Sequence, residues 1–247
     1  MALTKGCIYY TDNRPKSFIL EECQEQIKRA WSGKIISVSL MPIDFGENIV
    51  LEGRVRCYPT MVKQIAMGLE ALDTDIVFFL EHDVLYHPSH FDFMPTREDI
   101  YYYNLNNWRW SIKEEVVITY DNLRSLSQLC CYRKLALKHF QARLKYIEER
   151  GYDKEIGREP KWVRVMGYEP GTKQRRRGGF SDEQFEAWRS EFPNVDIRHR
   201  HTFSPPKTHL SDFRHAPINW RESKLEDFPY WDLKKLQDAW LDKYHIN

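Results

Sequence analysis

The sequence predicts an α/β protein of Rossmann-like form, with a mostly parallel sheet covered by helices on both faces and a loop-rich C-terminal part. Over residues 6–80, short apolar runs alternate with segments of helical periodicity. The run at residues 76–80 has no polar position, as expected for a strand buried on both faces. Strands alternating with helices of this length imply right-handed crossovers between parallel strands.

The first half of the chain reads strand, helix, strand, helix, strand. We expect strands at residues 6–10, 34–40 and 75–80, with helices at 15–31 and 59–72. Both helices have apolar residues at steps of three and four, which gives each one buried face. Each also begins at a proline, whose missing N–H costs nothing in the first helical turn.

The pattern changes after Pro88. Residues 100–110 and 115–120 are rich in aromatic and β-branched side chains, which favours strands that extend the sheet in antiparallel fashion. A helix capped by Ser127 is expected to run to Gly151. The remainder is rich in proline and should be mostly loop, with helices near residues 182–190 and 233–243.

The composition is that of one globular domain spanning residues 1–247. Hydrophobic residues make up 42% of the chain and charged residues 30%, and a chain of this length can bury a core without disulfides or a structural metal. The 37 basic and 36 acidic residues nearly cancel. The net charge therefore gives no reason to expect a polyanionic partner drawn by long-range attraction.

Cysteine usage and hydropathy bear on the compartment. The five cysteines are odd in number and lack CxxC spacing, so we expect reduced thiols. The N-terminal residues lack the pattern of a secretory signal. The longest strongly apolar run, residues 76–80, is far shorter than the roughly 20 residues that span a bilayer. We expect a cytoplasmic protein without a membrane span, from a bacterium or a phage-infected host.

The sharpest local feature is Glu81-His82-Asp83, directly after the apolar strand. Ligands of open α/β sheets bind at the carboxyl ends of the strands, so these side chains are expected in the binding crevice. Two carboxylates suit a hard divalent cation, Mn²⁺ or Mg²⁺, which neutralises charge on a diphosphate leaving group. Taken alone, the tripeptide is more typical of solvated carboxylates in a loop.

This strand, the E-x-D tripeptide and the following Val84-Leu85-Tyr86-His87-Pro88 together resemble the GT-A fold with its D-x-D type motif. The likeness is to glycosyltransferase family 2 and its bacterial and phage relatives. It covers residues 6–140 as an order of elements and residues 76–90 as a motif. It implies a GT-A-like domain in which residues 1–125 bind a nucleotide sugar and 126–247 form the acceptor side and the C-terminal part. Family members more often carry Asp where this chain has Glu81.

The resemblance implies a metal-dependent glycosyltransferase that uses a nucleotide diphosphate sugar, with a UDP-sugar favoured. Its metal ligands would be Glu81, Asp83 and His199. Its donor contacts would be Thr11, Asp12, Asn13, Arg56, Tyr58 and His82. Asp12 and Asn13 are also typical of a simple turn, and histidines such as His199 are as common in polar loops as in metal sites.

Transfer with inversion requires a general base, usually a carboxylate. Asp182 or Glu183 could serve, although Ser181-x-x-Gln184 is also a capping box. Stacking surfaces and cations indicate the acceptor side, at Trp108, Arg109, Trp110, Arg175, Arg176 and Arg177. They suit a hydroxymethylated base in phage DNA or a surface glycan. The alternatives are core packing for the tryptophans and a solvated loop for the arginines.

Two other functions stay open. A nucleotidyltransferase shares the α/β start and the metal carboxylates, but a glycine-rich phosphate loop would be expected after its first strand, and residues 11–15 contain no glycine. The other is a non-catalytic protein that binds carbohydrate or nucleic acid. The sequence does not indicate the acceptor, the anomeric outcome or the oligomeric state.

Overall fold

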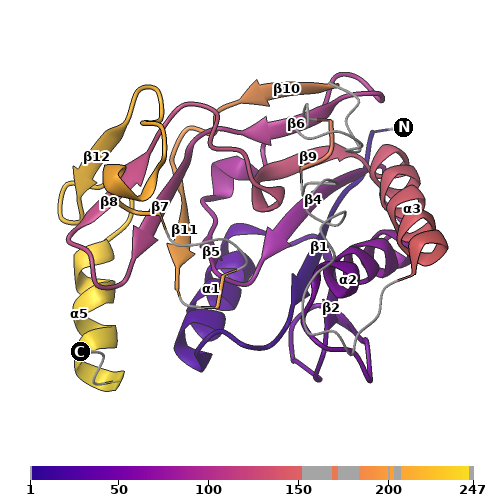
Figure 1. Cartoon of the computed structure of the whole chain (residues 1–247), viewed down its shortest axis with the longest axis horizontal. Helices are drawn as coiled ribbons and strands as arrows, with labels where there is room; N and C mark the ends of the chain where they lie inside the picture. Colours follow the sequence, from indigo (N-terminus) through magenta and orange to yellow (C-terminus); the bar gives the residue numbers. More distant parts are fainter. Residues whose placement is uncertain (1, 152–168, 172–183, 200, 203–206, 245–247) are drawn as a thin grey trace.

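The computed structural model describes residues 2–151, 169–171, 184–199, 201–202 and 207–244. These residues form an α/β structure with two mixed sheets and four α-helices (Figure 1). The α/β class expected from the sequence is confirmed, whereas the second sheet was not predicted. None of the described helices is both long enough and apolar enough to cross a bilayer.

The larger sheet has seven strands in the order β10-β6-β9-β4-β1-β2-β3. Its parallel part comprises β1 (Lys5–Thr11), β2 (Lys34–Ser39), β3 (Glu47–Val50) and β4 (Ile76–Glu81). It continues through β9 (Leu129–Tyr132), which is antiparallel to both β4 and β6 (Tyr101–Asn104), to the edge strand β10 (Phe185–Trp188), which is parallel to β6. The sheet is therefore parallel on one side of β4 and mixed on the other.

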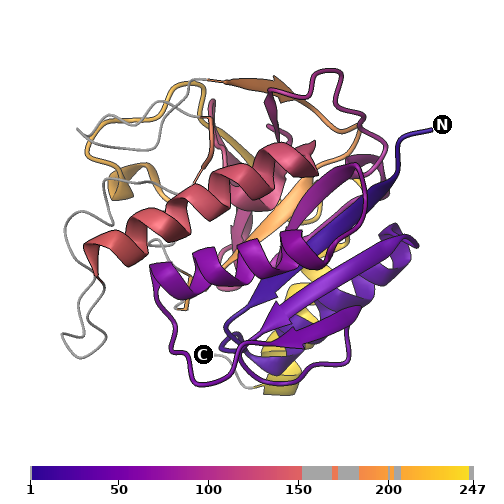
Figure 2. The ribbon, with the colours of Figure 1, turned by 90° about the vertical axis from the view of Figure 1, so that its right-hand side faces the viewer.

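Helices cover both faces of this sheet, as predicted. Side chains alternate along β1: Ile8 and Tyr10 pack toward α2 (Tyr58–Ala71) and α3 (Arg133–Arg150), whereas Cys7 and Tyr9 pack with Ile27 of α1 (Ser17–Ala30) on the opposite face. Figure 2 shows α2 and α3 side by side on their face.

The second sheet has five strands in the order β12-β8-β7-β11-β5. They are β5 (Val84–Leu85), β7 (Asn107–Ser111), β8 (Val116–Thr119), β11 (Asn194–Arg198) and β12 (Arg221–Lys224). Helix α5 (Leu233–Tyr244) packs on this sheet, where Trp240 stacks on Trp110 with ring centroids 5.7 Å apart. Phe18 of α1 contacts the same Trp240 at 5.0 Å, so α1 joins the two sheets.

Two expected helices differ in the structure. The helix assigned a cap at Ser127 begins only at Arg133, after the 3₁₀ turn η2 (Leu126–Gln128) and strand β9. Strand β9 is an apolar run that is almost wholly buried between β4 and β6, and this pairing overrides local helix propensity. The end of α3 at Gly151 is confirmed, with a φ of 67° that suits glycine.

The helix expected near residues 182–190 is wrong over its described part, since Phe185–Trp188 form β10 alongside β6. The helix expected at 233–243 is confirmed as α5. Two further 3₁₀ turns are η1 (Pro88–His90) and η3 (Leu210–Asp212).

Candidate active site

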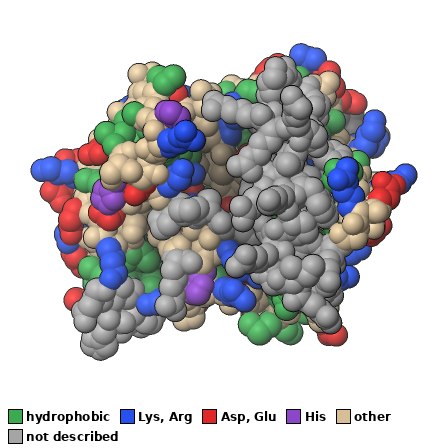
Figure 3. All heavy atoms as spheres, viewed as in Figure 1, with side chains coloured by type: hydrophobic (Ala, Val, Ile, Leu, Met, Phe, Trp, Pro, Cys, Tyr) green, Lys and Arg blue, Asp and Glu red, His purple; other side chains and the backbone are tan. Residues whose placement is uncertain are grey.

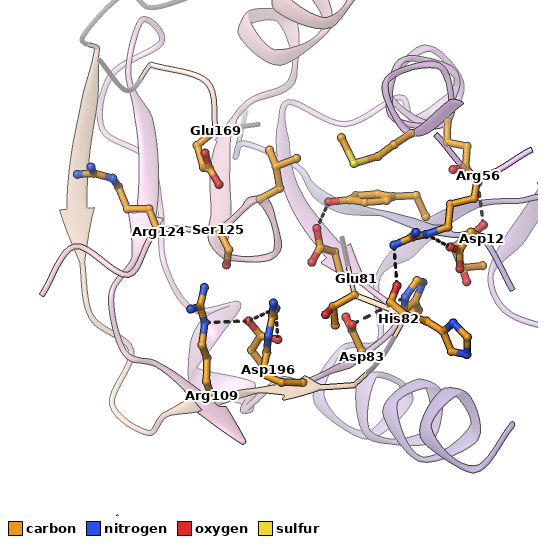
Figure 4. A pocket seen from close by; sticks show the side chains of 18 of the residues that line it. Asp12, Arg56, Glu81, His82, Asp83, Arg109, Arg124, Ser125, Glu169 and Asp196 are labelled. Carbon is orange, nitrogen blue, oxygen red and sulfur yellow. Dashed lines mark hydrogen bonds and ion pairs between the residues drawn. The ribbon is translucent and has the colours of Figure 1, made fainter. Parts of the chain in front are cut away.

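A cavity of about 410 Å³ opens where β1, β4 and β11 end. Asp12 follows β1, Glu81 ends β4 and Arg198 ends β11, and all three side chains line the cavity. Figure 4 shows Asp12 and Glu81 among the lining residues. Strands β1 and β4 are parallel neighbours, so their carboxyl ends meet at the same edge of the sheet. This is the position expected of a ligand site in an open α/β sheet.

His82, Asp83 and His199 form a compact group at this edge, and their three ligand atoms lie within 4.8 Å of one another. Asp83 Oδ2 lies 3.1 Å from His199 Nε2 and 3.9 Å from His82 Nε2. The pairing of β11 with β5 makes the contact, because Ile197 N donates to the carbonyl of Asp83 at 2.8 Å. Residues 116 positions apart in the sequence are thereby brought together.

The surroundings of His82 and Asp83 favour the protonation states that bind a metal ion. Burial lowers the pKa of His82 below its usual value, which favours the neutral imidazole that binds metals. Burial opposes ionisation of Asp83, but the facing His82, His199 and Arg198 outweigh it and lower the pKa of that carboxyl. His82 Nδ1 is buried without a hydrogen-bond partner among the described residues.

The three residues therefore fit a divalent metal ion. Two imidazole nitrogens and one carboxylate oxygen are ligands for transition metals such as Mn²⁺ or Zn²⁺, whereas Mg²⁺ prefers oxygen ligands throughout. Of the two ions expected from the sequence, Mn²⁺ suits this set of ligands better.

Glu81 lies in the same cavity but outside this group of three. The parallel register sets Tyr10 beside it, and the Tyr10 hydroxyl donates to Glu81 Oε1 at 2.6 Å. Burial and the nearby Asp83 raise the pKa of Glu81 to about 8, so this carboxyl is mostly protonated at neutral pH. Its role as a metal ligand stays a prediction.

The residues predicted to hold the nucleotide divide into two sets. Thr11, Asp12, Arg56 and His82 line the cavity, and Arg56 Nε lies 2.7 Å from Asp12 Oδ2. Asn13 has a φ of 59° and its side chain accepts from the backbone N–H groups of residues 40 and 41, which joins the ends of β1 and β2.

Tyr58 is almost fully buried, and its hydroxyl accepts from Arg143 at 2.6 Å between α2 and α3. The structure therefore gives Tyr58 and Asn13 contacts that hold elements together rather than positions in the cavity lining.

Of the predicted acceptor residues, Arg109 lines the cavity. Because side chains alternate along β7, Trp108 and Trp110 point to the other face, where Trp110 is fully buried under α5 and Trp108 contacts Phe228 at 5.2 Å. Core packing therefore describes these tryptophans. The remaining candidates, Asp182, Glu183, Arg175, Arg176 and Arg177, lie outside the described residues.

Two further buried residues of the cavity, Asp196 and Arg198, were not predicted from the sequence. Their side chains are 6% and 8% exposed, and Arg198 Nη1 lies 3.2 Å from each oxygen of Asp196. The signal was present, because charged residues at 196 and 198 alternate with Val195 and Ile197, which are fully buried. Such alternation indicates a strand with its polar face toward a site.

No family model matches this chain, and no curated protein matches its sequence. Its structure is distantly similar to that of the bifunctional IspDF from Campylobacter jejuni, with a TM-score of 0.35 and 10% sequence identity. The match covers 85% of this chain and 53% of IspDF, so the chain spans about half the length of that protein. A likeness this distant carries no argument about activity, which has to come from the site itself.

Figure 4 shows three groups of charged side chains one after another from one side of the cavity to the other. Asp12 and Arg56 are at one end, His82 and Asp83 are in the middle, and Arg109 and Asp196 are at the other end. Arg198, which also lines the cavity, pairs with Asp196. Such a cavity can accept a ligand whose polar groups contact these charged clusters, with a metal ion held beside it.

Proposed function

We propose that this protein is a metal-dependent glycosyltransferase that uses a nucleotide diphosphate sugar as donor. The observation that carries the proposal is the group of His82, Asp83 and His199 at the carboxyl end of β4. Two of its members, His82 and Asp83, line the cavity. The motif resemblance of residues 76–90 to GT-A enzymes supports the choice of a sugar donor.

Each part of the cavity has a role in this proposal. The Asp12 carboxylate accepts hydrogen bonds from ribose hydroxyls or a base edge, and Arg56 contributes positive charge beside the diphosphate. His82, Asp83 and His199 hold the divalent ion, which when bound stabilises the charge that develops on the leaving diphosphate. The sugar then extends toward Asp196 and Arg198.

Two classes of acceptor are compatible with this proposal, a glycan hydroxyl and a hydroxymethylated base in DNA. On the face drawn in Figure 3, basic and acidic side chains are mixed over the described part of the surface, and the net charge is +1. Binding of duplex DNA draws most of its affinity from phosphate contacts to Lys and Arg. The mixed surface charge therefore favours the glycan.

The test is thermal unfolding with a panel of UDP-, GDP- and dTDP-sugars and of nucleoside triphosphates, each with Mn²⁺ and with EDTA. A ligand at 100 times its Kd stabilises the fold by about 2.7 kcal/mol, which corresponds to a rise in Tm of roughly 5–10 °C for a chain of this size. We expect at least one nucleotide sugar to give this rise with Mn²⁺ and not with EDTA.

Two variants control the test. His199→Ala should remove the Mn²⁺-dependent rise. His209→Ala should keep it, because His209 is an exposed residue whose ring contacts Glu114 at 3.2 Å outside the cavity. If nucleoside triphosphates alone stabilise the protein with Mn²⁺, the nucleotidyltransferase alternative replaces our proposal. If no nucleotide has a Mn²⁺-dependent effect, both are wrong.

A further inference from the structure

The described residues that line the cavity include five carboxylates: Asp12, Glu81, Asp83, Glu169 and Asp196. Three of them already have defined contacts toward the nucleotide and metal side. Asp12 pairs with Arg56, Glu81 accepts from Tyr10, and Asp83 belongs to the histidine group. Of these five carboxylates, Glu169 and Asp196 therefore remain as candidates for a role toward the acceptor.

Asp196 is held rigidly by its strand. Val195 and Ile197 on either side are fully buried in the core of the second sheet, and β11 lies between β7 and β5. In the antiparallel pairing of β11 with β5, Asp196 lies opposite Val84, the residue that follows Asp83. Asp196 thus faces the cavity directly beside the metal group, on a strand that cannot move without disturbing the core.

Two arginines orient the carboxylate. Arg198 Nη1 is 3.2 Å from both oxygens, and Arg109 Nε is 3.8 Å from Oδ2. Arg109 is itself fixed, since its Nη1 donates to the Tyr120 hydroxyl at 3.0 Å. A carboxylate has about four acceptor positions, and these contacts leave room for a hydroxyl group of a ligand.

We infer that Asp196 is the catalytic base, which takes the proton of the acceptor hydroxyl; this inference rests on the proposed function. The O–H bond of the acceptor breaks and its proton passes to an oxygen of Asp196. The acceptor oxygen forms a bond to the anomeric carbon of the donor sugar. The bond from that carbon to the diphosphate breaks, and its electron pair leaves with the nucleoside diphosphate. A single displacement of this kind inverts the anomeric configuration.

The test compares water with azide as the attacking group and needs no knowledge of the natural acceptor. Water has to lose a proton as it attacks, whereas azide does not. The probes are UDP-glucose, UDP-N-acetylglucosamine, GDP-mannose and dTDP-glucose with Mn²⁺, and the readouts are nucleoside diphosphate release, glycosyl azide formation and donor Kd. The wild type, Asp196→Asn and Glu169→Gln are measured side by side.

We expect Asp196→Asn to lower hydrolysis of the donor by about 100-fold or more, the usual contribution of a general base. Its donor Kd should stay within about threefold, and its rate of glycosyl azide formation should approach that of the wild type. The azide product should have the anomeric configuration opposite to that of the donor. Glu169→Gln should lower the rate of donor hydrolysis far less than Asp196→Asn does.

Three results would overturn the inference: unchanged hydrolysis in Asp196→Asn, a loss that azide does not restore, or the larger loss in Glu169→Gln. A weakened donor Kd with hydrolysis otherwise normal would make Asp196 a ligand of the donor sugar instead. If the wild type releases nucleoside diphosphate from none of the probes with water or azide, the proposed function itself fails.

Asp196→Asn leaves two buried arginines facing an uncharged side chain, which can destabilise the fold. The double variant Asp196→Asn with Arg109→Gln removes one cation together with the carboxylate, and the same azide comparison applies to it. Retained Mn²⁺-dependent donor binding in either variant shows that the cavity is intact.

Discussion

At the scale of single residues, neighbours in the sequence differ in their surroundings. His82 precedes Asp83 directly and Glu81 lies two residues before it, yet only His82 joins Asp83 in the group of three possible metal ligands. Glu81 is hydrogen-bonded to Tyr10 at 2.6 Å instead. The candidate metal group of the structure therefore contains the middle and last residues of the tripeptide, and the role of Glu81 as a ligand stays a prediction.

We predict that His82→Ala weakens Mn²⁺ binding by about tenfold or more, whereas Glu81→Gln has a smaller effect. Removal of a metal ligand costs at least as much as removal of a residue that orients one, which is about 10- to 100-fold. Isothermal titration of the two variants with Mn²⁺ measures the difference. The opposite order would return Glu81 to the role implied by the D-x-D motif.

His90 is a second residue whose behaviour depends on its surroundings. It is fully buried, its Nδ1 lies 3.1 Å from Asn104 Nδ2 and 3.0 Å from Asn194 Nδ2, and burial lowers its pKa to about 3. Between about pH 6.5 and pH 3 the unfolded chain therefore binds a proton at this position that the folded chain does not. The stability associated with neutral His90 is complete above pH 6.5 and is lost as the pH falls.

We predict that His90→Gln, which keeps a neutral hydrogen-bonding side chain, makes the free energy of unfolding less dependent on pH. Between pH 6 and pH 4 the wild type should lose up to about 1.4 kcal/mol more per pH unit than the variant. Urea unfolding across this range measures both slopes. The control is His215→Gln, a change at an exposed histidine. Equal slopes for the wild type and His90→Gln would contradict the prediction.

At the scale of elements, α5 is the helix that covers the second sheet. Trp240 is 5% exposed and stacks on Trp110 at an interplanar angle of 17°. Trp110 lies on β7 next to Arg109, which lines the cavity. The packing of α5 therefore supports the strand that carries one of the two arginines beside Asp196.

We predict that Trp240→Ala lowers the free energy of unfolding by about 3–5 kcal/mol, because it removes a large aromatic side chain from a packed core. Ile218→Ala, at a side chain that is 71% exposed, should change it by less than about 0.5 kcal/mol. Chemical denaturation of both variants provides the comparison. A small loss for Trp240→Ala would mean that α5 contributes little to the core of the second sheet.

At the scale of the whole molecule, the five cysteines are all free and differ in exposure. Cys7, Cys23, Cys130 and Cys131 are buried, and burial raises the pKa of each thiol. Cys57 is half-buried and lines the cavity. The fold thus places one accessible thiol at the site that we propose for the donor.

We predict that a small disulfide reagent modifies one thiol in the native protein and five after unfolding. The native reaction should disappear in Cys57→Ser and should slow when Mn²⁺ and a bound nucleotide sugar are both present. Absorbance of the released thiolate follows the reaction. Fast modification of several thiols, or no protection by a donor that binds, would place the ligand elsewhere.

The sequence by itself determined the α/β class, the parallel strands β1, β2 and β4, the helices between them, and the position of Glu81-His82-Asp83 at a strand end. These features follow from local periodicity, from the proline in the first turn of α2 and from apolar runs, all of which can be read within a window of about 10–20 residues. Pro15, which was expected to open the first helix, lies before α1, which begins at Ser17. Helix α5 and the end of α3 at Gly151 have signals of the same local kind.

Only the tertiary structure decided the second sheet, the identity of β9 and the composition of the cavity. Residues 129–132 are strand because they pair with both β4 and β6, and local propensity contains no information about such partners. In the same way, the contact between Asp83 and His199 and the pairing of Asp196 with Arg109 depend on where β11 joins its sheet. The alternation of residues along β11 shows which side chains lie on the same face of the strand. Which site that face lines depends on the neighbouring strands, which are distant in the sequence.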